Sequence, residues 1–261
     1  MIRRIILLFL IGLSLSSMAQ EKVVENQRLM WFRYFLKVPM AKDWQFRSEI
    51  EERTYMFPWH HHQFLIRNHL GKSLGKGWSG AFGLTLFWQT LPHEPQAEDY
   101  IALFELRLQQ EMMHKQKLSD RISLTQRFWL EERIFQKVDE FGEPIPELAY
   151  GTLRFRFAFG ADFILWQSEN RTQNLKLTIF DEIMINLLSA NIGANVFDQN
   201  RVGVTLSYKL SSRYTFGITY MNWYQQRTSG YDYFNRQILR FTFFHTIPTR
   251  KSRPSIPALN Q

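Results

Sequence analysis

The sequence predicts an all-β fold, a transmembrane antiparallel up-and-down β-barrel of about 10–12 strands. Three observations predict it. Apolar and polar residues alternate along nearly the whole chain, the N-terminus has the features of an export signal, and a chain with 16% aromatic residues contains no cysteine. An exported protein without disulfides needs another source of stability. A sheet that closes on itself provides one, and lipid can cover its aromatic face.

Residues 1–19 have the features of a cleaved signal peptide. Two arginines precede an apolar stretch over residues 5–15, and Ser, Met and Ala at 17–19 supply small residues at both positions that a signal peptidase reads. A buried or membrane-spanning helix is the alternative, but the apolar run is shorter than the roughly 20 residues that a bilayer requires. We therefore expect an exported mature chain that begins at Gln20.

Period-two alternation is clearest in residues 201–210, where Val, Val, Leu, Tyr and Leu alternate with Arg, Gly, Thr, Ser and Lys. Residues 153–163 repeat it, with Leu or Phe at most odd positions and Arg, Ala, Gly or Asp between them. Successive side chains of a strand point to opposite faces, so each segment has one apolar and one polar face. This criterion gives eleven candidate strands, at about 28–38, 43–56, 62–70, 78–89, 101–114, 119–137, 150–167, 173–190, 198–210, 213–226 and 234–247.

Residues 100–137 are the hardest part of the chain to assign to strands, because their Glu, Gln, Met, Lys and Leu favour helix. Helical spacing from Phe104 gives a poor apolar stripe, whereas alternation gives a consistent one, so we expect strand. Eleven is an odd number, and single-chain bacterial barrels usually have an even one. A missed strand near residues 20–30, or a segment outside the sheet, would resolve the difference.

The connections follow a pattern that fits an up-and-down barrel. Those after odd-numbered strands are short, while two of the others, 90–100 and 138–149, are longer. Bacterial barrels have short turns at the periplasmic rim and longer loops at the outer rim. We expect one barrel domain over residues 20–247, followed by a disordered, basic, proline-rich tail over 248–261.

The polar faces predict the interior of the barrel. A lipocalin-type soluble barrel also alternates, but its apolar face points inward. Here the polar faces combine Arg and Glu at spacings that allow pairing across neighbouring strands, which offsets the cost of burying them. We expect a lumen-lining polar ladder made of Arg47, Glu49, Glu51, Arg53, Arg67, Glu105, Arg107, Glu111, Arg127, Glu131, Arg133, Arg154, Arg156, Glu182, Asn186 and Arg201.

The tryptophans are consistent with this orientation. Trp59 lies in a connection, and the positions near strand ends fit an aromatic girdle at the membrane interface. Trp31 and Trp129 instead fall on inward positions. The tryptophans expected near strand ends are Trp44, Trp78, Trp88, Trp166 and Trp223.

Residues 195–201 (Asn-Val-Phe-Asp-Gln-Asn-Arg), followed by a strand ending in Tyr-Lys, resemble a large family of uncharacterised outer-membrane barrels, a domain of unknown function numbered 2490. The resemblance covers most of residues 27–247 and implies an exported barrel in the outer membrane of a Gram-negative bacterium. It implies no reaction. The residues that carry it are Phe197, Asp198, Gln199, Asn200 and Arg201, with Glu51 and Arg53, Arg127 with Glu131 and Arg133, and Asp181 and Glu182 with Asn186.

Sites for chemistry are few. His60, His61 and His62 invite a metal interpretation, but consecutive strand residues point to opposite sides, so we expect an outer-loop tip and no metal. A lipid-modifying hydrolase is the alternative function and would need a Ser–His pair. Its candidates are Ser123, Ser207, His69, His114 and His245, and no Gly-x-Ser-x-Gly motif accompanies them. We therefore predict no catalytic residues and no cofactor.

The charge balance indicates the partners. The formal net charge is +8, and loss of Arg3 and Arg4 with the signal peptide leaves +6. Because the chain is exported, membrane lipids and lipopolysaccharide phosphates are the expected partners, and nucleic acid is not. The sequence names no protein partner. The ladder itself has two interpretations, a structural plug of paired charges or a passage or cavity for a small anionic solute.

Overall fold

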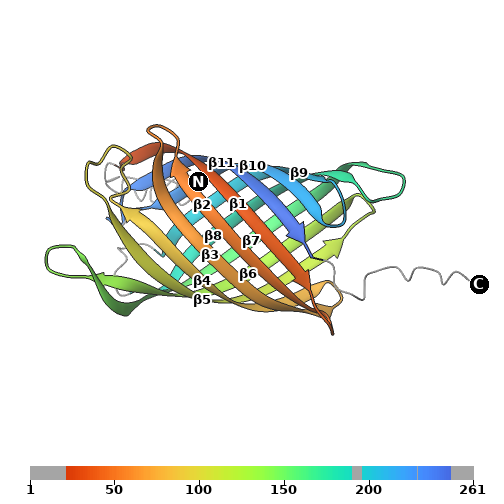
Figure 1. Ribbon diagram of the computed structural model, residues 1–261, viewed down its shortest axis with the longest axis horizontal. Helices are drawn as coiled ribbons and strands as arrows, with labels where there is room; N and C mark the ends of the chain where they lie inside the picture. Colours follow the sequence, from red (N-terminus) through yellow and green to blue (C-terminus); the bar gives the residue numbers. More distant parts are fainter. Residues whose placement is uncertain (1–21, 190–195, 228, 248–261) are drawn as a thin grey trace, which may run out of the picture.

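The computed structural model describes residues 22–189, 196–227 and 229–247, so the expected signal peptide and tail lie outside the described residues. The described part is all β, as expected, and contains no helix that could span a bilayer. Figure 1 shows its eleven strands. They are β1 (Val24–Pro39), β2 (Trp44–Tyr55), β3 (His60–Gly75), β4 (Trp78–Leu91), β5 (Ile101–Lys117), β6 (Ile122–Val138), β7 (Pro144–Gln167), β8 (Asn174–Ser189), β9 (Phe197–Lys209), β10 (Tyr214–Gln226) and β11 (Tyr233–Thr246).

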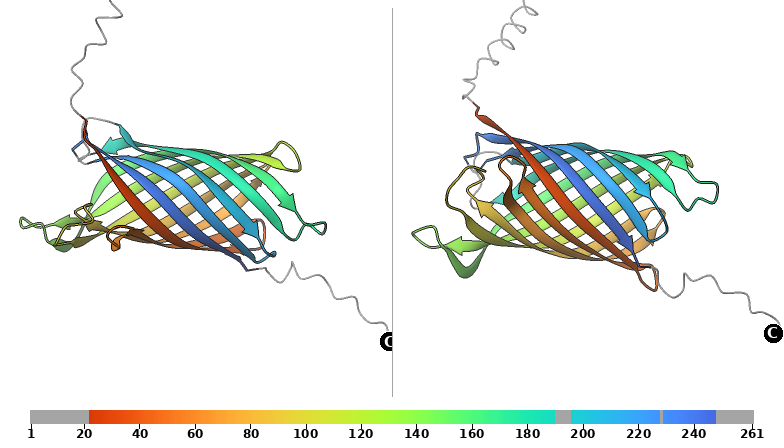
Figure 2. Two further views of the ribbon diagram at one scale, coloured as in Figure 1. Left: turned by 90° about the horizontal axis from the view of Figure 1, so that it is seen from above. Right: turned by 45° about the horizontal axis from the view of Figure 1, so that its top comes forward.

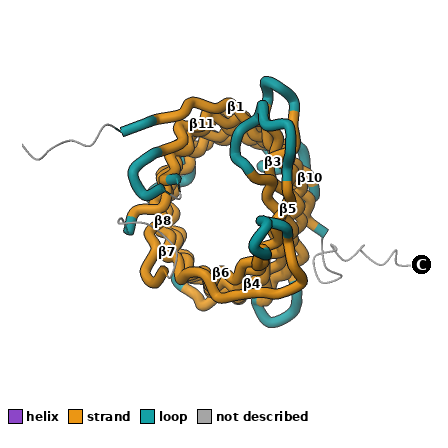
Figure 3. Tube along the Cα trace, turned by 90° about the vertical axis from the view of Figure 1, so that its left-hand side faces the viewer, coloured by secondary structure: helices purple, strands orange, loops and turns teal. Residues whose placement is uncertain are grey.

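The strands close into one barrel, which Figure 3 shows end-on. Consecutive strands pair antiparallel all the way from β1 to β11, and the two terminal strands then pair with each other in parallel. An odd number of up-and-down strands requires this, because the first and last run in the same direction. The antiparallel expectation therefore holds except at the β1–β11 seam. The odd strand count needs no extra strand near residues 20–30, since β1 itself begins at Val24.

Two expectations about local structure have different outcomes. Residues 101–117 and 122–138 are strands, as alternation predicted and helix propensity did not. The long connection expected at 138–149 is wrong, because β7 begins at Pro144 and leaves only 139–143 as a loop. The hairpin of β6 and β7 instead projects beyond the barrel, at the left of Figure 1.

The connections divide the barrel into two ends, which we call the turn end and the loop end. The turn end carries the connections after odd-numbered strands and lies at the right in Figures 1 and 2. In its tightest turn, Lys76 and Gly77 both have positive φ (49° and 83°), as a two-residue type I′ hairpin requires. A Cβ at Gly77 would also collide with the carbonyl oxygen of Lys115, so glycine is needed there.

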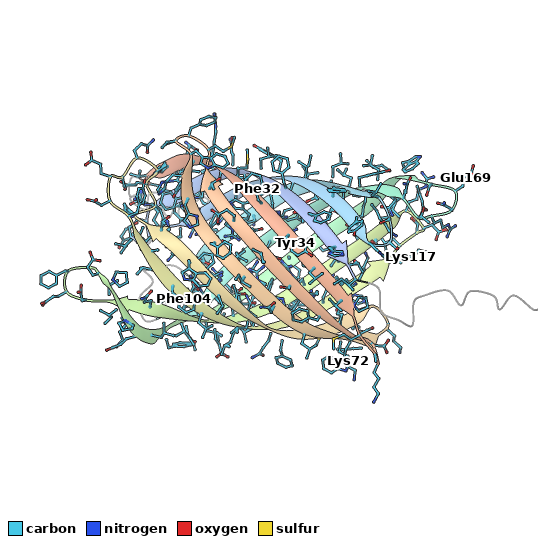
Figure 4. All side chains as sticks on the ribbon, in the orientation of Figure 1. Phe32, Tyr34, Lys72, Phe104, Lys117 and Glu169 are labelled. Carbon is cyan, nitrogen blue, oxygen red and sulfur yellow. The ribbon has the colours of Figure 1, made fainter. Side chains whose placement is uncertain are left out.

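The apolar rows face outward. On β7, Arg154 and Arg156 are buried, while Phe159 on the alternate face is 40% exposed. Figure 4 shows side chains projecting from the visible side of the barrel, with Phe32 of β1 and Phe104 of β5 among them. This is the arrangement of a barrel that stands in lipid, with alternation outward-apolar and inward-polar along each strand.

Candidate functional site

Glu131 on β6 occupies the centre of the lumen, and its side chain is fully buried. Its Oε2 accepts a hydrogen bond from Arg154 Nε (2.8 Å), and its Oε1 accepts from Arg156 Nη1 (2.9 Å) and Gln109 Nε2 (2.7 Å). The bonds come from both neighbouring strands, β5 and β7. Glu131 is thus fully satisfied as an ionised carboxylate, which is the condition under which a buried charge is tolerated.

The two arginines of β7 extend this network to β8 and β9. Arg156 Nη2 donates to Glu182 Oε1 (2.8 Å), which also accepts from Arg127 Nη2 (2.7 Å). Arg154 Nη1 donates to Asp198 Oδ2 (2.8 Å). Each of the two guanidinium groups therefore bridges two carboxylates, a geometry that suits the planar fork of arginine and that a lysine could not reproduce.

Two further ion-paired groups lie nearer the loop end. Glu105 accepts hydrogen bonds from both Arg107 (2.7 and 2.8 Å) and Arg133 (3.1 Å for Nη2). Arg53 Nε donates to Glu51 Oε1 (2.7 Å). Glu51 and Arg53 lie two residues apart on the inner face of β2, as Glu105 and Arg107 do on β5, so the alternation of each strand brings these opposite charges together.

Tryptophans pack among the guanidinium groups on the opposite side of the lumen. Trp31 and Trp223 meet edge to face with ring centroids 5.6 Å apart. The Arg53 guanidinium lies 3.9 Å from the Trp31 ring, and those of Arg201 and Arg236 lie 4.7 and 4.6 Å from the Trp223 ring. Such cation–π contacts are worth up to about 2 kcal/mol when desolvated.

Several contacts cross the lumen between strands that are not neighbours in the sheet. Arg47 Nη2 of β2 donates to Glu111 Oε1 of β5 (2.7 Å), and the Arg67 guanidinium of β3 lies 5.0 Å from the Trp129 ring of β6. All four residues also line a cavity toward the turn end, so these contacts narrow the lumen there without filling it. Nearer the loop end the interior is packed, because large inward side chains such as Trp223 and Arg236 are almost fully buried.

At the loop end, the connection between β4 and β5, residues 92–100, packs against inward-facing residues. Its His93 contacts the rings of His62 (5.4 Å) and Phe234 (5.9 Å), and its carbonyl oxygen accepts a hydrogen bond from Gln27 Nε2 (2.7 Å). Burial, followed by the positive charges of Arg236 and Arg227, lowers the pKa of the His93 imidazole to about 3. His93 is therefore neutral near pH 7 in this position.

A cavity of about 380 Å³ remains in the half of the lumen toward the turn end. It begins at Trp31, Trp129 and Arg156 and reaches residues near the turns, such as Phe35 and Phe244. Nine cationic side chains line it against five anionic ones. The cationic residues are Arg33, Arg47, Arg53, Arg67, Arg127, Arg156, Lys176, Arg201 and Arg240, and the anionic ones are Glu49, Glu51, Glu111, Asp162 and Glu182.

The turn end outside the cavity is also basic. Lys72 and Lys117 lie there together with the acidic Glu169 (Figure 4). Ten Lys or Arg of the described residues lie at or beside these turns against three Asp or Glu. They are Lys37, Lys42, Lys72, Lys76, Lys115, Lys117, Arg121, Arg171, Lys209 and Arg213, against Asp43, Asp120 and Glu169. The mouth of the cavity is thus surrounded by positive potential.

The structure places the residues of the expected polar ladder inside the barrel. Asn186, the uncharged member, is buried and its Oδ1 accepts from Thr152 Oγ1 (3.4 Å). In the 197–201 motif, a β-bulge turns Asp198 inward beside Gln199, whereas Asn200 faces outward and donates to Asp181. Arg201 lines the cavity.

The ladder predicted from the sequence omitted three arginines. Arg33, Arg236 and Arg240 also face the lumen. The alternation on their own strands was the available signal, because Phe32, Leu239 and Phe241 occupy the outward positions beside them. Trp223 was expected in the aromatic girdle, and that expectation is wrong. It is one of the alternate residues of β10 that point inward, so it lies in the lumen.

The histidines differ from expectation. Residues 60–62 open β3 instead of forming a loop tip: His61 Nδ1 contacts Glu52 (2.6 Å), His60 stacks on Tyr100, and a β-bulge leaves His62 buried. Among the described residues, no group of three or more His, Cys, Asp or Glu could hold a metal ion.

The hydrolase alternative has no supporting contact in the described part of the chain. His69 packs on Trp129 in the lumen, His114 stacks on Trp78, and His245 contacts Tyr34 on the outer face. Of the two serines, Ser123 contacts Asp162 (3.5 Å). Neither serine hydroxyl contacts a histidine ring within the described residues, so no nucleophile–base pair is formed there.

An apolar exterior around an ion-paired interior defines the class of β-barrels built to stand in a membrane. The chain belongs to the family described as "Protein of unknown function (DUF2490)", which matches residues 29–235. No curated protein matches the sequence. Among solved structures, a NanC porin is 10% identical with a TM-score of 0.44, over 78% of this chain and 91% of that one. At that TM-score neither fold nor function is transferred from it.

Proposed function

We propose that the protein is an outer-membrane β-barrel that admits small anionic solutes into its charged lumen from the turn end, and that the packed half of the lumen blocks free passage toward the loop end. The observation that carries the proposal is the excess of cationic over anionic side chains around the cavity, nine against five. Charges enclosed in a low-dielectric site need compensation, and a small anion supplies it.

The outer membrane is the location that fits this barrel. The outer face carries apolar side chains in rows, and the N-terminal sequence has the features of an export signal. Lipid chains would cover the apolar rows. Basic residues at the turn end, such as Lys42 and Lys76, would contact lipid phosphates at the membrane surface, and the same contacts would be available to lipopolysaccharide.

The packed half of the lumen argues against an open pore. Porins of about 16–18 strands leave an aqueous channel and barrels of about eight strands are filled by side chains, so a barrel of eleven strands lies between the two. Here Trp31, Trp223 and the ion-paired carboxylates fill it. Passage of a solute would require those side chains to move, so binding in the cavity comes before any passage.

Recording from planar bilayers tests the proposal. Wild-type protein is expected to be silent or to open rarely, whereas a variant with both Trp31→Ala and Trp223→Ala is expected to give discrete currents. In a KCl gradient the reversal potential should have the sign of an anion-selective path. A matched control replaces two exposed tryptophans of the outer surface, Trp44→Ala with Trp166→Ala, and should stay silent. A continuously open wild-type channel, or cation selectivity in the double variant, would contradict the proposal.

A further inference from the structure

Two arginines face the cavity from the two strands of the parallel seam. In the β1–β11 register, Trp31 lies opposite Arg240 and Arg33 lies opposite Thr242. The two guanidinium groups therefore project into the cavity from adjacent strands, two positions apart. Like charges on neighbouring positions of a sheet repel each other, so this arrangement needs a compensating group.

Arg240 differs from most arginines of the lumen in its partners. It makes no ion pair with any described residue, and its side-chain hydrogen bond is a long one, from Nη2 to Thr219 Oγ1 (3.4 Å). Its Nε is buried and has no hydrogen-bond partner among the described residues. Arg47 in the same cavity also has a buried Nε without a partner, but its Nη2 pairs with Glu111 at 2.7 Å.

Arg33 is only weakly compensated. Its Nη1 lies 3.8 Å from Glu49 Oε2, and Glu49 is already engaged by Arg67 Nη1 at 2.9 Å. The single carboxylate of Glu49 therefore has to compensate two guanidinium groups, those of Arg33 and Arg67. The nearest additional polar contact of Arg33 is from Nε to Thr242 Oγ1 (3.3 Å).

Each of the two guanidinium groups donates a hydrogen bond to the hydroxyl of one threonine, Thr242 for Arg33 and Thr219 for Arg240. Thr219 and Thr242 are buried, and Thr219 Oγ1 also lies 2.7 Å from Thr205 Oγ1 on β9, which lines the cavity. The site therefore has two cationic groups and a hydroxyl, open to a cavity large enough for a small molecule. Guanidinium groups bind phosphate and carboxylate oxygens with two parallel hydrogen bonds.

We infer that Arg33 and Arg240 form an oxyanion-binding subsite at the parallel seam, which binds a small multivalent oxyanion, a phosphate or a dicarboxylate. The inference rests on the proposed function, because it names the ligand class and the residues for the same cavity. A multivalent anion fits best, since it can contact both guanidinium groups at once and offset more of the surrounding positive charge.

Isothermal titration of the purified full-length protein in detergent, in a chloride buffer, tests the inference. Inorganic phosphate and succinate are the two probes, and the tighter one identifies the oxyanion type. Arg240→Gln is expected to weaken binding of that probe by at least about tenfold, the effect of losing a charge-assisted contact. Arg47→Gln removes a positive charge from the same cavity, but this arginine is paired with Glu111. It is therefore expected to weaken binding of the probe by no more than about threefold.

Thermal unfolding without added oxyanion gives an independent readout. Arg240→Gln is expected to leave the midpoint unchanged or to raise it, since it removes a buried cationic group that makes no ion pair, whereas Arg47→Gln should lower it by leaving Glu111 unpaired. Adding the oxyanion should raise the wild-type midpoint and leave that of Arg240→Gln nearly unchanged. Arg240→Lys should recover part of the binding.

The outcomes separate this inference from the proposed function. Equal weakening by Arg240→Gln and Arg47→Gln would show that the anion is held by the cavity as a whole, which overturns the seam subsite alone. Absence of binding by wild-type protein to either probe would overturn both the subsite and the anionic cavity.

Discussion

Individual arginines, and not lysines, hold the lumen together. Arg154 bridges Glu131 and Asp198, and Arg53 pairs with Glu51 while its flat face lies 3.9 Å from the Trp31 ring. Only a planar group with donors on several edges can pair and stack at once. The choice of Arg is therefore explained by geometry and not by charge alone.

Glu131 provides the sharpest test of this network. Glu131→Gln should lower the free energy of unfolding by about 3–5 kcal/mol, because it leaves two buried guanidinium groups short of a counter-charge. Urea-induced unfolding in detergent, followed by tryptophan fluorescence, measures it. The control is Glu147→Gln, which removes an exposed pair with Lys137 and should leave the urea midpoint almost unchanged. Similar losses of stability in both variants would show that the ion pairs of Glu131 contribute no more than an exposed surface pair.

Which residues face the lumen could be predicted from the sequence, but which of them pair could not. Alternation alone assigns Arg154 and Glu131 to the interior. Their contact depends on the β6–β7 register, and the contact of Arg47 with Glu111 depends on side chains reaching across from β2 to β5. His62 was misplaced for a related reason, since a β-bulge shifts its parity and a single sequence gives no signal for it.

Among the elements, strands were predictable because period-two alternation persists even where helix propensity opposes it, as in β5. The strand boundaries were less predictable. β7 begins at Pro144, because residues 144–149 extend the hairpin past the barrel, and these residues show little apolar alternation. The parallel seam follows from the strand count, but the sequence alone could not exclude a twelfth strand between β1 and β11.

Cross-linking tests the seam directly, because the chain has no native cysteine. Met30 lies opposite Leu239 in the β1–β11 register. Met30→Cys with Leu239→Cys should form an intramolecular link under oxidation or with a short bis-thiol reagent, since neighbouring strands lie about 4.8 Å apart. Met30→Cys with Tyr220→Cys places the second thiol one strand further away, on β10, and should not link. An unlinked first pair beside a linked second pair would refute the seam.

The loop over residues 92–100 should respond to acid through His93. Its pKa in the folded protein is lowered from 6.5 to about 3, so the unfolded or displaced loop binds a proton first as the pH falls. Packing of the loop is therefore complete above about pH 6.5 and is weakened progressively between there and pH 3. At pH 5 the loss is at most about 2 kcal/mol.

Hydrogen exchange of residues 92–100, corrected for intrinsic rates, measures this response. Wild-type protein should exchange faster in the loop at about pH 5 than at about pH 7, and His93→Asn should remove the difference. His61→Asn changes a half-exposed histidine on the outer face and should leave it intact. If His93→Asn retained the full pH response, another group would have to be responsible.

At the scale of the whole molecule, the position of the apolar band relates the cavity to the membrane. Asn26, Asn222 and Asn235 form an outward hydrogen-bonded row near the loop end (2.6 and 2.8 Å), where a lipid-facing surface would carry apolar side chains. Toward the turn end the outer rows of β9 to β11 are apolar. On the side of the barrel formed by β9 to β11, the apolar band therefore lies at the level of the cavity.

Leu206 lies within this band, and its substitution separates a membrane barrel from a soluble one. Its outward neighbours on the strand are Val204 and Tyr208, and Leu177 and Ile218 lie opposite it on β8 and β10. Leu206→Arg should destabilise the barrel folded into phospholipid vesicles by about 2–4 kcal/mol, because a charge then faces hydrocarbon.

Leu210 is the matched control, since both leucines are 43% exposed but Leu210 lies in the turn between β9 and β10. Leu210→Arg should cost no more than about 1 kcal/mol near the interface. In a soluble barrel both side chains would face water, and the two variants would then fold equally well. The difference between two equally exposed leucines, measured by folding into vesicles, therefore reports the solvent on the outer face. Equal stabilities, together with recovery of the protein without detergent, would show that this solvent is water.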